Sequence, residues 1–307
     1  MHTDKKHSKK PIIILIPVVL LIAVLLYMAA NRYLIRHVKV NNALDTANTG
    51  TEDSDTEYTA DDWNYNSDTV TIKINKMTTG TGNDTITYYT ADVTIKDSSS
   101  LKSAFADNKF GQNIVEDTSI IASTNNAIFA INGDYYGFRD DGIIIRNGKI
   151  FRDVPARTGL SFYSDGSMKI YDEATTTAEE LVKEGVTQTL SFGPALVENG
   201  KAITGLGKTE IDTNFGNHTI QGSNPRTGVG IISPNHYVFV VVDGRSRGYS
   251  KGMTLDEFSE LFVSLGCTDA YNLDGGGSST MYFMGKVVNS PLGKDKERGV
   301  SDILYIG

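Results

Sequence analysis

Four polar, glycine-marked segments each follow an apolar stretch of the sequence, and they carry the residue types that could do chemistry. The segments are AIFAINGDYYGFR (127–139), SNPRTGVGI (223–231), VFVVVDGRSRGYS (238–250) and AYNLDGGGSSTM (270–281). When several strands end in Asn, Asp or Arg beside glycine, their loops can meet at one edge and let a ligand approach the backbone. The pattern therefore predicts one ligand site built from four loops.

Three aspartates in these loops, Asp134, Asp243 and Asp274, are candidates for the acid, base or nucleophile of a hydrolytic reaction. Asn132 is a candidate hydrogen-bonding partner. For each of them the alternative is an Asx turn after a strand. Carboxylates are also the ligands of hard cations, so the sequence leaves open whether Ca²⁺ or Mg²⁺ binds among them, and it indicates no other cofactor.

Arginines and a glycine run in the same loops suit an anionic substrate. A guanidinium group can hold phosphate or carboxylate through two parallel hydrogen bonds, which makes Arg226 and Arg245 candidates. Backbone N–H groups and three hydroxyls can cradle an anion in the run Gly275, Gly276, Gly277, Ser278, Ser279 and Thr280. The structural alternatives are a salt bridge for the arginines and a tight loop between strands for the run.

Several function classes are disfavoured by composition. The formal net charge is −8, which would repel a nucleic-acid backbone. His218 and His236 are the only histidines beyond the N-terminal region, which argues against a zinc site. No G-x-S-x-G occurs, so a Ser-His-Asp hydrolase has no support. Cys267 ends a helical pattern and is interpreted as a buried small hydrophobe.

The elements that must position these loops are mostly strands. Alternating residues around TTGTGND predict a hairpin over 69–96. Helical patterns are fewer, and Thr254 before Glu257 predicts a capping box for the last of them. The sequence thus predicts one strand-rich α+β domain over 69–307. The further strands are expected at 127–132, 143–146, 160–163, 168–171, 188–192, 227–232, 237–242, 270–273, 280–284 and 302–306, and the helices at 98–108, 117–126, 176–185 and 253–266.

The N-terminal region has a different character. Residues 1–10 form a basic tail, and residues 11–30 carry no charge, which predicts a transmembrane signal anchor with a cytoplasmic N-terminus. A cleaved signal peptide is the alternative. Residues 41–68 contain eight acidic residues and no basic one, so 31–68 is interpreted as a flexible stalk. These features predict a single-pass membrane protein, with its domain outside the cell.

Several separated motifs resemble the phosphodiester glycosidase family. They occur in the family's order and together span roughly residues 70–307. The matching segments are INGDYYGF (131–138), SFGPALVENG (191–200), NPRTGVGI (224–231), residues 240–281 and, more loosely, RGVSDILYIG (298–307).

The resemblance implies hydrolysis of the C1–O bond in sugar-1-phosphodiesters of N-acetylglucosamine type, within cell-wall or exopolysaccharide glycans. Sugar and phosphomonoester would be the products. It also implies that Asn132, Asp134, Arg226, Asp243, Arg245, Asp274 and the loop 275–280 belong to the site. We expect Asp274 and Asp243 to act at C1, without choosing between their roles, and the arginines and the loop to hold the phosphate.

Two other interpretations stay open. A non-catalytic glycan-binding module would stack sugar rings on Tyr135, Tyr136 and Tyr249. A metal-dependent phosphodiesterase would cleave the P–O bond instead, although few histidine ligands are present. The sequence does not predict the oligomeric state.

Overall fold

The computed structural model describes residues 10–44, 57–211 and 220–307. Within this part the chain forms four α-helices and five sheets, all of whose strand pairs are antiparallel. The helices are α1 (Lys10–Tyr33), α2 (Thr118–Thr124), α3 (Ala178–Lys183) and α4 (Leu255–Ser264).

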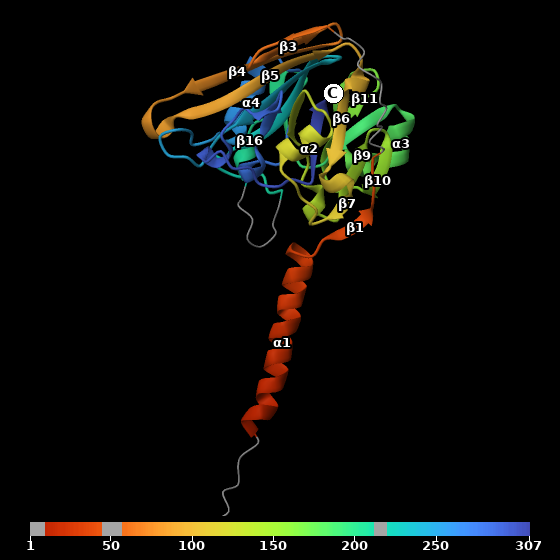
Figure 1. Ribbon diagram of the computed structural model, residues 1–307, viewed down its shortest axis with the longest axis vertical. Coiled ribbons are helices and arrows are strands. Elements are labelled where there is room, and N and C mark those ends of the chain that lie inside the picture. Colours follow the sequence, from red (N-terminus) through yellow and green to blue (C-terminus); the bar gives the residue numbers. More distant parts are fainter. Residues whose placement is uncertain (1–9, 45–56, 212–219) are drawn as a thin grey trace, which may run out of the picture.

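Two large sheets dominate the fold (Figure 1). The nine-stranded sheet has the order β15 (Lys201–Ala202), β14 (Ala195–Glu198), β18 (Asp269–Asn272), β16 (Arg226–Ser233), β17 (His236–Val242), β5 (Ile86–Ile95), β4 (Val70–Thr79), β3 (Asn64–Ser67) and β2 (Tyr58–Ala60). The five-stranded sheet has the order β20 (Lys286–Val287), β19 (Met281–Phe283), β8 (Phe129–Asn132), β21 (Asp302–Ile306) and β6 (Leu101–Phe105).

Three smaller sheets complete the described strands. One has the order β12 (Met168–Asp172), β11 (Thr158–Tyr163) and β13 (Val186–Leu190). The two-stranded sheets are β1 (His37–Val40) with β7 (Phe110–Gln112), and β10 (Lys149–Val154) with β9 (Gly142–Arg146).

The main core lies between the two large sheets. Ile72 and Val93 from the nine-stranded sheet share it with Ile131 and Leu304 from the five-stranded sheet. A second apolar cluster joins the outer face of the nine-stranded sheet to α4, and a third joins the outer face of the five-stranded sheet to α2. The result is a sandwich of two sheets with one helix on each outer face.

Strand β17 shows how the sequence specifies these layers. Its residues Tyr237, Phe239 and Val241 enter the main core, while the alternate valines pack toward α4. Because both faces are covered, the strand reads as a continuous apolar run. On the neighbouring strand, a Cβ atom at Gly228 would lie 2.8 Å from the Phe258 ring, so glycine there lets α4 pack closely.

Most of the predicted elements are confirmed. β4 and β5 form the hairpin, and α2, α3 and α4 lie within three of the four predicted helices. The predicted capping box of α4 is present. Cys267 is buried as expected, and burial raises its thiol pKa to about 12. The helix predicted over 98–108 is wrong, because β6 occupies its centre and pairs with β21.

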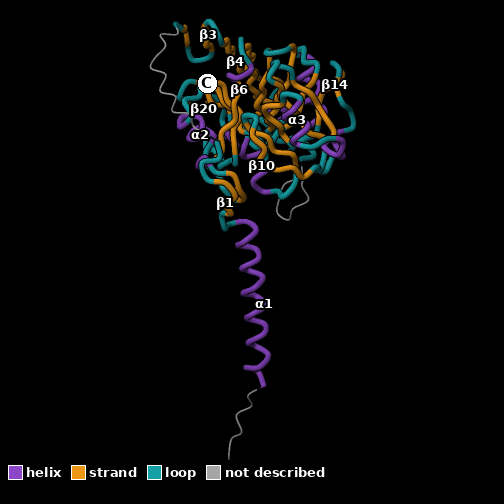
Figure 2. Tube along the Cα trace, turned by 90° about the vertical axis from the view of Figure 1, so that its right-hand side faces the viewer, coloured by secondary structure: helices purple, strands orange, loops and turns teal. Residues whose placement is uncertain are grey.

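The N-terminal region differs from the prediction. Helix α1 extends away from the folded domain (Figures 1 and 2). In the part of the chain that the structure describes, no helix is both long and apolar enough to cross a membrane, so the predicted transmembrane helix is not supported.

The segment predicted as a stalk contains strands. β1 pairs with β7, and β2 and β3 extend the nine-stranded sheet. Aromatic residues explain the difference, because Tyr65 is buried and stacks on Tyr58, with the ring centroids 5.1 Å apart. Residues 1–9 of the predicted tail and 45–56 of the predicted stalk lie outside the described residues.

Candidate active site

The loop after β18 carries Asp274, whose carboxylate is partly exposed. Its Oδ2 accepts hydrogen bonds from Ser278 Oγ at 2.6 Å and from Arg298 Nη2 at 3.2 Å, and its side chain is 14% exposed. Burial raises the pKa of this carboxyl, and the charge of Arg298 is the largest influence in the opposite direction. The Asp274 carboxylate is therefore held in place by hydrogen bonds and still reaches solvent. A group that reacts with substrate needs both properties.

Two arginines lie against neighbouring glycines of this loop. A Cβ atom at Gly276 would lie 3.3 Å from Arg245 Nη1, and one at Gly277 would lie 3.1 Å from Arg298 Cδ. Gly276 also has a φ of +65°, which favours glycine. The charge of Arg298 contributes to lowering the pKa of Arg245, after burial. Since the two cations repel each other, an anion that binds near both is stabilised.

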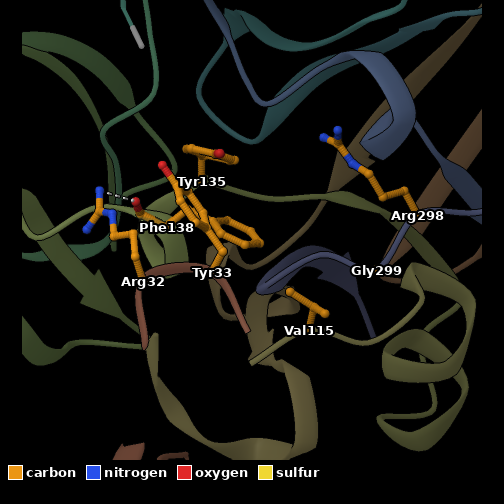
Figure 3. Close-up of a pocket in the computed structure, with 7 residues that line it drawn as sticks. All are labelled: Arg32, Tyr33, Val115, Tyr135, Phe138, Arg298 and Gly299. Atoms are coloured by element: carbon orange, nitrogen blue, oxygen red, sulfur yellow. Dashed lines mark hydrogen bonds between the residues drawn. The ribbon is translucent and has the colours of Figure 1, made fainter. Parts of the chain in front are cut away.

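A cavity of about 330 Å³ opens beside Arg298 (Figure 3). This volume lies at the lower end of the roughly 300–1,000 Å³ of small-molecule sites. Aromatic rings form one side, where Tyr135 stacks on Phe138 with the ring centroids 4.8 Å apart. Such a wall suits the C–H face of a sugar ring. The cavity is lined by Arg32, Tyr33, Val115, Tyr135, Phe138, Arg298 and Gly299.

Asn132 is fully buried and connects three elements. Its Nδ2 donates to the backbone oxygen of Asp274 at 2.7 Å. Its Oδ1 accepts from Thr227 Oγ1 at 2.8 Å and from the Thr280 N–H at 3.2 Å. The side chain therefore fixes the loop that carries Asp274, which favours a positioning role over direct contact with phosphate.

Asp134 belongs to a buried cluster of charges. Its Oδ2 accepts from the Ser191 N–H at 2.6 Å and lies 3.8 Å from Arg146 Nη2. Its N–H donates to Asp302 Oδ1 at 2.8 Å, and Asp302 pairs with Arg146. The Asp134 charge contributes to raising the pKa of Asp274, so the two carboxylates interact electrostatically. Asp134 itself is 3% exposed, and its contacts are with protein groups.

Asp243 is held apart from the cavity of Figure 3. Its Oδ1 accepts from Asn289 Nδ2 at 2.8 Å, and its Oδ2 accepts from Tyr249 OH at 2.7 Å and from the Ser290 N–H at 3.0 Å. Burial raises its pKa. Asn289 also donates to the backbone oxygen of Ser279 at 3.0 Å. Asp243 therefore supports the loop 275–280 through Asn289.

Arg226 is buried against backbone oxygens. Its Nε donates to Met253 at 2.9 Å, and its Nη2 donates to Ile220 at 2.6 Å and to Gly222 at 2.8 Å. Burial lowers its pKa to about 10, with Arg245 adding to the shift. This geometry favours a role in tying the segment 220–222 to the segment at Met253, while Arg245 and Arg298 lie beside Asp274.

The remaining predicted groups belong to the loop 275–280 that follows Asp274. Gly275 packs against Pro225, since a Cβ atom at Gly275 would lie 2.7 Å from the backbone oxygen of Pro225. The hydroxyls of Ser279 and Thr280 are buried and have no hydrogen-bond partner among the described residues. No group of three or more His, Cys, Asp or Glu side chains that could hold a metal ion occurs in the described ranges.

The sequence reasoning missed the charged residues that complete the site. Arg298 contacts both Asp274 and Ser278, and Arg146 and Asp302 form the buried pair beside Asp134. Arg298 lies within the RGVSD segment but follows no strand. It therefore does not fit the pattern of polar residues after apolar strands that indicated the other candidates. Arg146 ends β9, and Asp302 begins β21.

Comparison with known proteins gives a consistent result. The model of the family described as phosphodiester glycosidase matches residues 125–307. The SPbeta prophage-derived uncharacterized protein YomE of Bacillus subtilis strain 168 is 34% identical over 206 residues, which cover 64% of this chain and 30% of that protein. The chain thus spans less than a third of the length of this relative.

Solved structures share the fold. The zebrafish N-acetylglucosamine-1-phosphodiester alpha-N-acetylglucosaminidase catalytic domain, auto-inhibited by its pro-peptide, has a TM-score of 0.61 at 21% identity, over 81% of this chain and 87% of that one. A hypothetical protein from Synechocystis has a TM-score of 0.59 at 13% identity, over 78% and 62% of the two chains. With the family match over most of the folded domain, the chain belongs to the phosphodiester glycosidase family.

Proposed function

We propose that this protein hydrolyses the C1–O bond of a sugar-1-phosphodiester and releases the sugar and a phosphomonoester. N-acetylglucosamine is the sugar that we propose, within cell-wall or exopolysaccharide glycans, because the zebrafish relative is named for that sugar. The observation that carries the proposal is the placement of Asp274 beside Arg298, which lines a cavity of about 330 Å³. A bacterial cell surface is the proposed location, because cell-wall and exopolysaccharide glycans lie there.

In the proposed reaction the phosphate lies between Arg245 and Arg298, and the sugar lies against Tyr135 and Phe138. As the C1–O bond breaks, the phosphate leaves as an anion, and the two guanidinium groups stabilise its charge. Asp274 acts at C1, either as the base that takes a proton from water or as the nucleophile. A base gives inversion at C1, whereas a nucleophile gives retention, so the anomer released tells the two apart.

Product analysis tests the function. The full chain is incubated with UDP-N-acetylglucosamine and with a synthetic N-acetylglucosamine phosphodiester, and the products are identified by mass spectrometry and NMR. Free N-acetylglucosamine and a phosphomonoester are expected. Sugar-1-phosphate would instead show P–O cleavage, and it would overturn the proposal. No product, together with saturable glycan binding, would identify a binding module.

Replacing Arg298 with glutamine is expected to change the pH profile as well as the affinity. The Arg298 charge opposes the effect of burial on Asp274, so its loss raises the carboxyl pKa further. Because Asp274 must be ionised to act at C1, the acid limb of kcat/KM moves to higher pH. Loss of a charge-assisted contact to phosphate should also raise KM about 10- to 100-fold.

The matched control for this variant is Arg247→Gln. Arg247 is exposed and donates to Asn83 Oδ1 at 3.1 Å, in the turn between β4 and β5. Its replacement should leave both the pH profile and KM unchanged. An Arg298 variant with the profile and KM of the unaltered enzyme would show that Arg298 neither holds the phosphate nor tunes Asp274.

A further inference from the structure

A second cavity, of about 460 Å³, lies beside the loop that carries Arg245. Ser246, the neighbour of Arg245, forms part of its wall, and the loop at Gly293 packs so closely on Ser246 that a Cβ atom there would lie 2.3 Å from Ser246 Oγ. The lining residues are Lys76, Tyr89, Ser246, Tyr249, Val287, Val288, Asn289, Ser290, Gly293 and Asp295.

One buried carboxylate organises this cavity. Asp243 is 1% exposed, and it accepts hydrogen bonds from the Tyr249 hydroxyl, the Asn289 amide and the Ser290 N–H. All three donors belong to residues that line the cavity. The cavity wall is therefore fixed before any ligand arrives, which lowers the entropic cost of binding. This arrangement also accounts for an aspartate at the end of β17 whose carboxylate does not reach the first cavity.

Aromatic rings and a cation form the exposed side of the cavity. Lys76 Nζ lies 5.5 Å from the Tyr89 ring centroid and 5.9 Å from that of Tyr249, and its charge acts to lower the pKa of Asp243, against the effect of burial. Trp63 stacks on Tyr89 at a centroid distance of 6.4 Å with an angle of 14° between the rings. Aromatic faces pack on the apolar C–H face of a pyranose, while ammonium, amide and carboxylate groups bind its hydroxyls.

We propose that this second cavity binds a sugar unit of the glycan to which the phosphate is esterified. The two cavities are linked through the Gly276–Gly277 segment, because Gly277 lies against Arg298 of the first cavity, and Gly276 lies against Arg245, the neighbour of Ser246 in the second. A phosphodiester held by the two arginines would place its sugar-1 group in the first cavity and its alcohol in the second. The inference rests on the proposed hydrolysis, because it names the alcohol that the phosphate carries.

Kinetics with two kinds of ester test this inference. N-acetylglucosamine-1-phosphate is esterified to methanol or to a trisaccharide, either of β-1,4-linked glucose or of β-1,4-linked N-acetylglucosamine. We expect kcat/KM for at least one trisaccharide ester to exceed that for the methyl ester about tenfold. Lys76→Ala should reduce this ratio toward one. Lys73→Ala, on the opposite face of the same strand, should keep the ratio of the unaltered enzyme.

A second measurement does not depend on hydrolysis. Trp63 is the single tryptophan of the chain and stacks on a cavity residue, so its fluorescence reports occupancy. A saturable change with a free trisaccharide, weakened by Lys76→Ala, is expected. Inorganic phosphate should not reproduce it, and an equal response to phosphate would overturn the inference, because the cavity would then be an anion site.

The two proposals fail in different ways. Hydrolysis of the methyl ester with no trisaccharide preference and no fluorescence change would overturn the sugar-binding cavity and leave the proposed reaction standing. If neither ester is hydrolysed, the proposed reaction falls, and the fluorescence titration alone decides whether the cavity binds sugar.

Discussion

Asp274→Asn is expected to lower kcat for hydrolysis of an N-acetylglucosamine phosphodiester by about 10³-fold, within the range of roughly 10²–10⁴ attributed to a positioned acid or base. Asparagine keeps the size of the side chain and an oxygen that can accept from Ser278 Oγ. It cannot ionise, so it can neither take a proton from water nor attack C1. Since the arginines and the aromatic wall remain, KM should change little.

Steady-state kinetics with purified full-length chain measure this effect, and circular dichroism checks that the variant is folded. The matched control is Asp269→Asn, at the other end of β18, where the carboxylate accepts from the Asn199 N–H at 3.4 Å. Its kcat should match that of the unaltered enzyme. If Asp274→Asn keeps more than about a tenth of kcat, another group must act at C1, and the role assigned to Asp274 is wrong.

The fold was predictable where a local pattern determines the outcome. Alternation over 69–96 specifies the β4–β5 hairpin, and the capping residues Thr254 and Glu257 specify the start of α4. The segment 98–108 shows the limit. Its local pattern suits a helix, yet pairing of Leu101–Phe105 with β21, far along the chain, makes it a strand. The acidic composition of 58–67 likewise predicted a flexible stalk. The segment forms strands instead, because Tyr65 is buried and stacks on Tyr58.

The sequence predicted which loops form the site. It predicted less well which of their side chains face a ligand and which bind other parts of the protein. Strand ends carrying Asn and Asp were found because such positions can be read from the sequence. Whether Arg226 faces a ligand or backbone oxygens depends on how Ile220, Gly222 and Met253 fold against it, which no local pattern encodes. The same holds for Asp243, whose partners Asn289 and Ser290 lie more than 40 residues away.

Arg146→Met is expected to lower the free energy of unfolding by about 3–5 kcal/mol at neutral pH, because removing one member of a buried ion pair leaves uncompensated charge. The side chains of Arg146 and Asp302 are 0% and 1% exposed, and Arg146 Nε donates to Asp302 Oδ2 at 2.7 Å. Asp134 lies 3.8 Å from the same guanidinium group. The variant would therefore bury two carboxylates with no cation between them.

The effect should depend on pH, and its direction follows from Asp302. Burial raises the pKa of this carboxyl to about 6 in the folded protein, and Arg146 opposes that rise. A group with a raised folded-state pKa contributes stability at low pH that is lost as pH rises through that pKa. Without Arg146 the pKa of Asp302 rises further, so the variant continues to lose stability up to a higher pH than the unaltered protein does. Urea unfolding should thus show a smaller deficit at pH 5 than at pH 8.

The exposed pair of Lys286 and Asp62 is the control for this prediction. Their side chains are 70% and 75% exposed at a separation of 2.8 Å, and such pairs contribute about 0–1 kcal/mol. Asp62→Asn should therefore change stability little at either pH. A deficit below about 1 kcal/mol for Arg146→Met, equal at both pH values, would contradict the prediction. Because Asp302 also holds the Asp134 N–H, the same ion pair would then no longer explain how the loop beside the active site is kept in place.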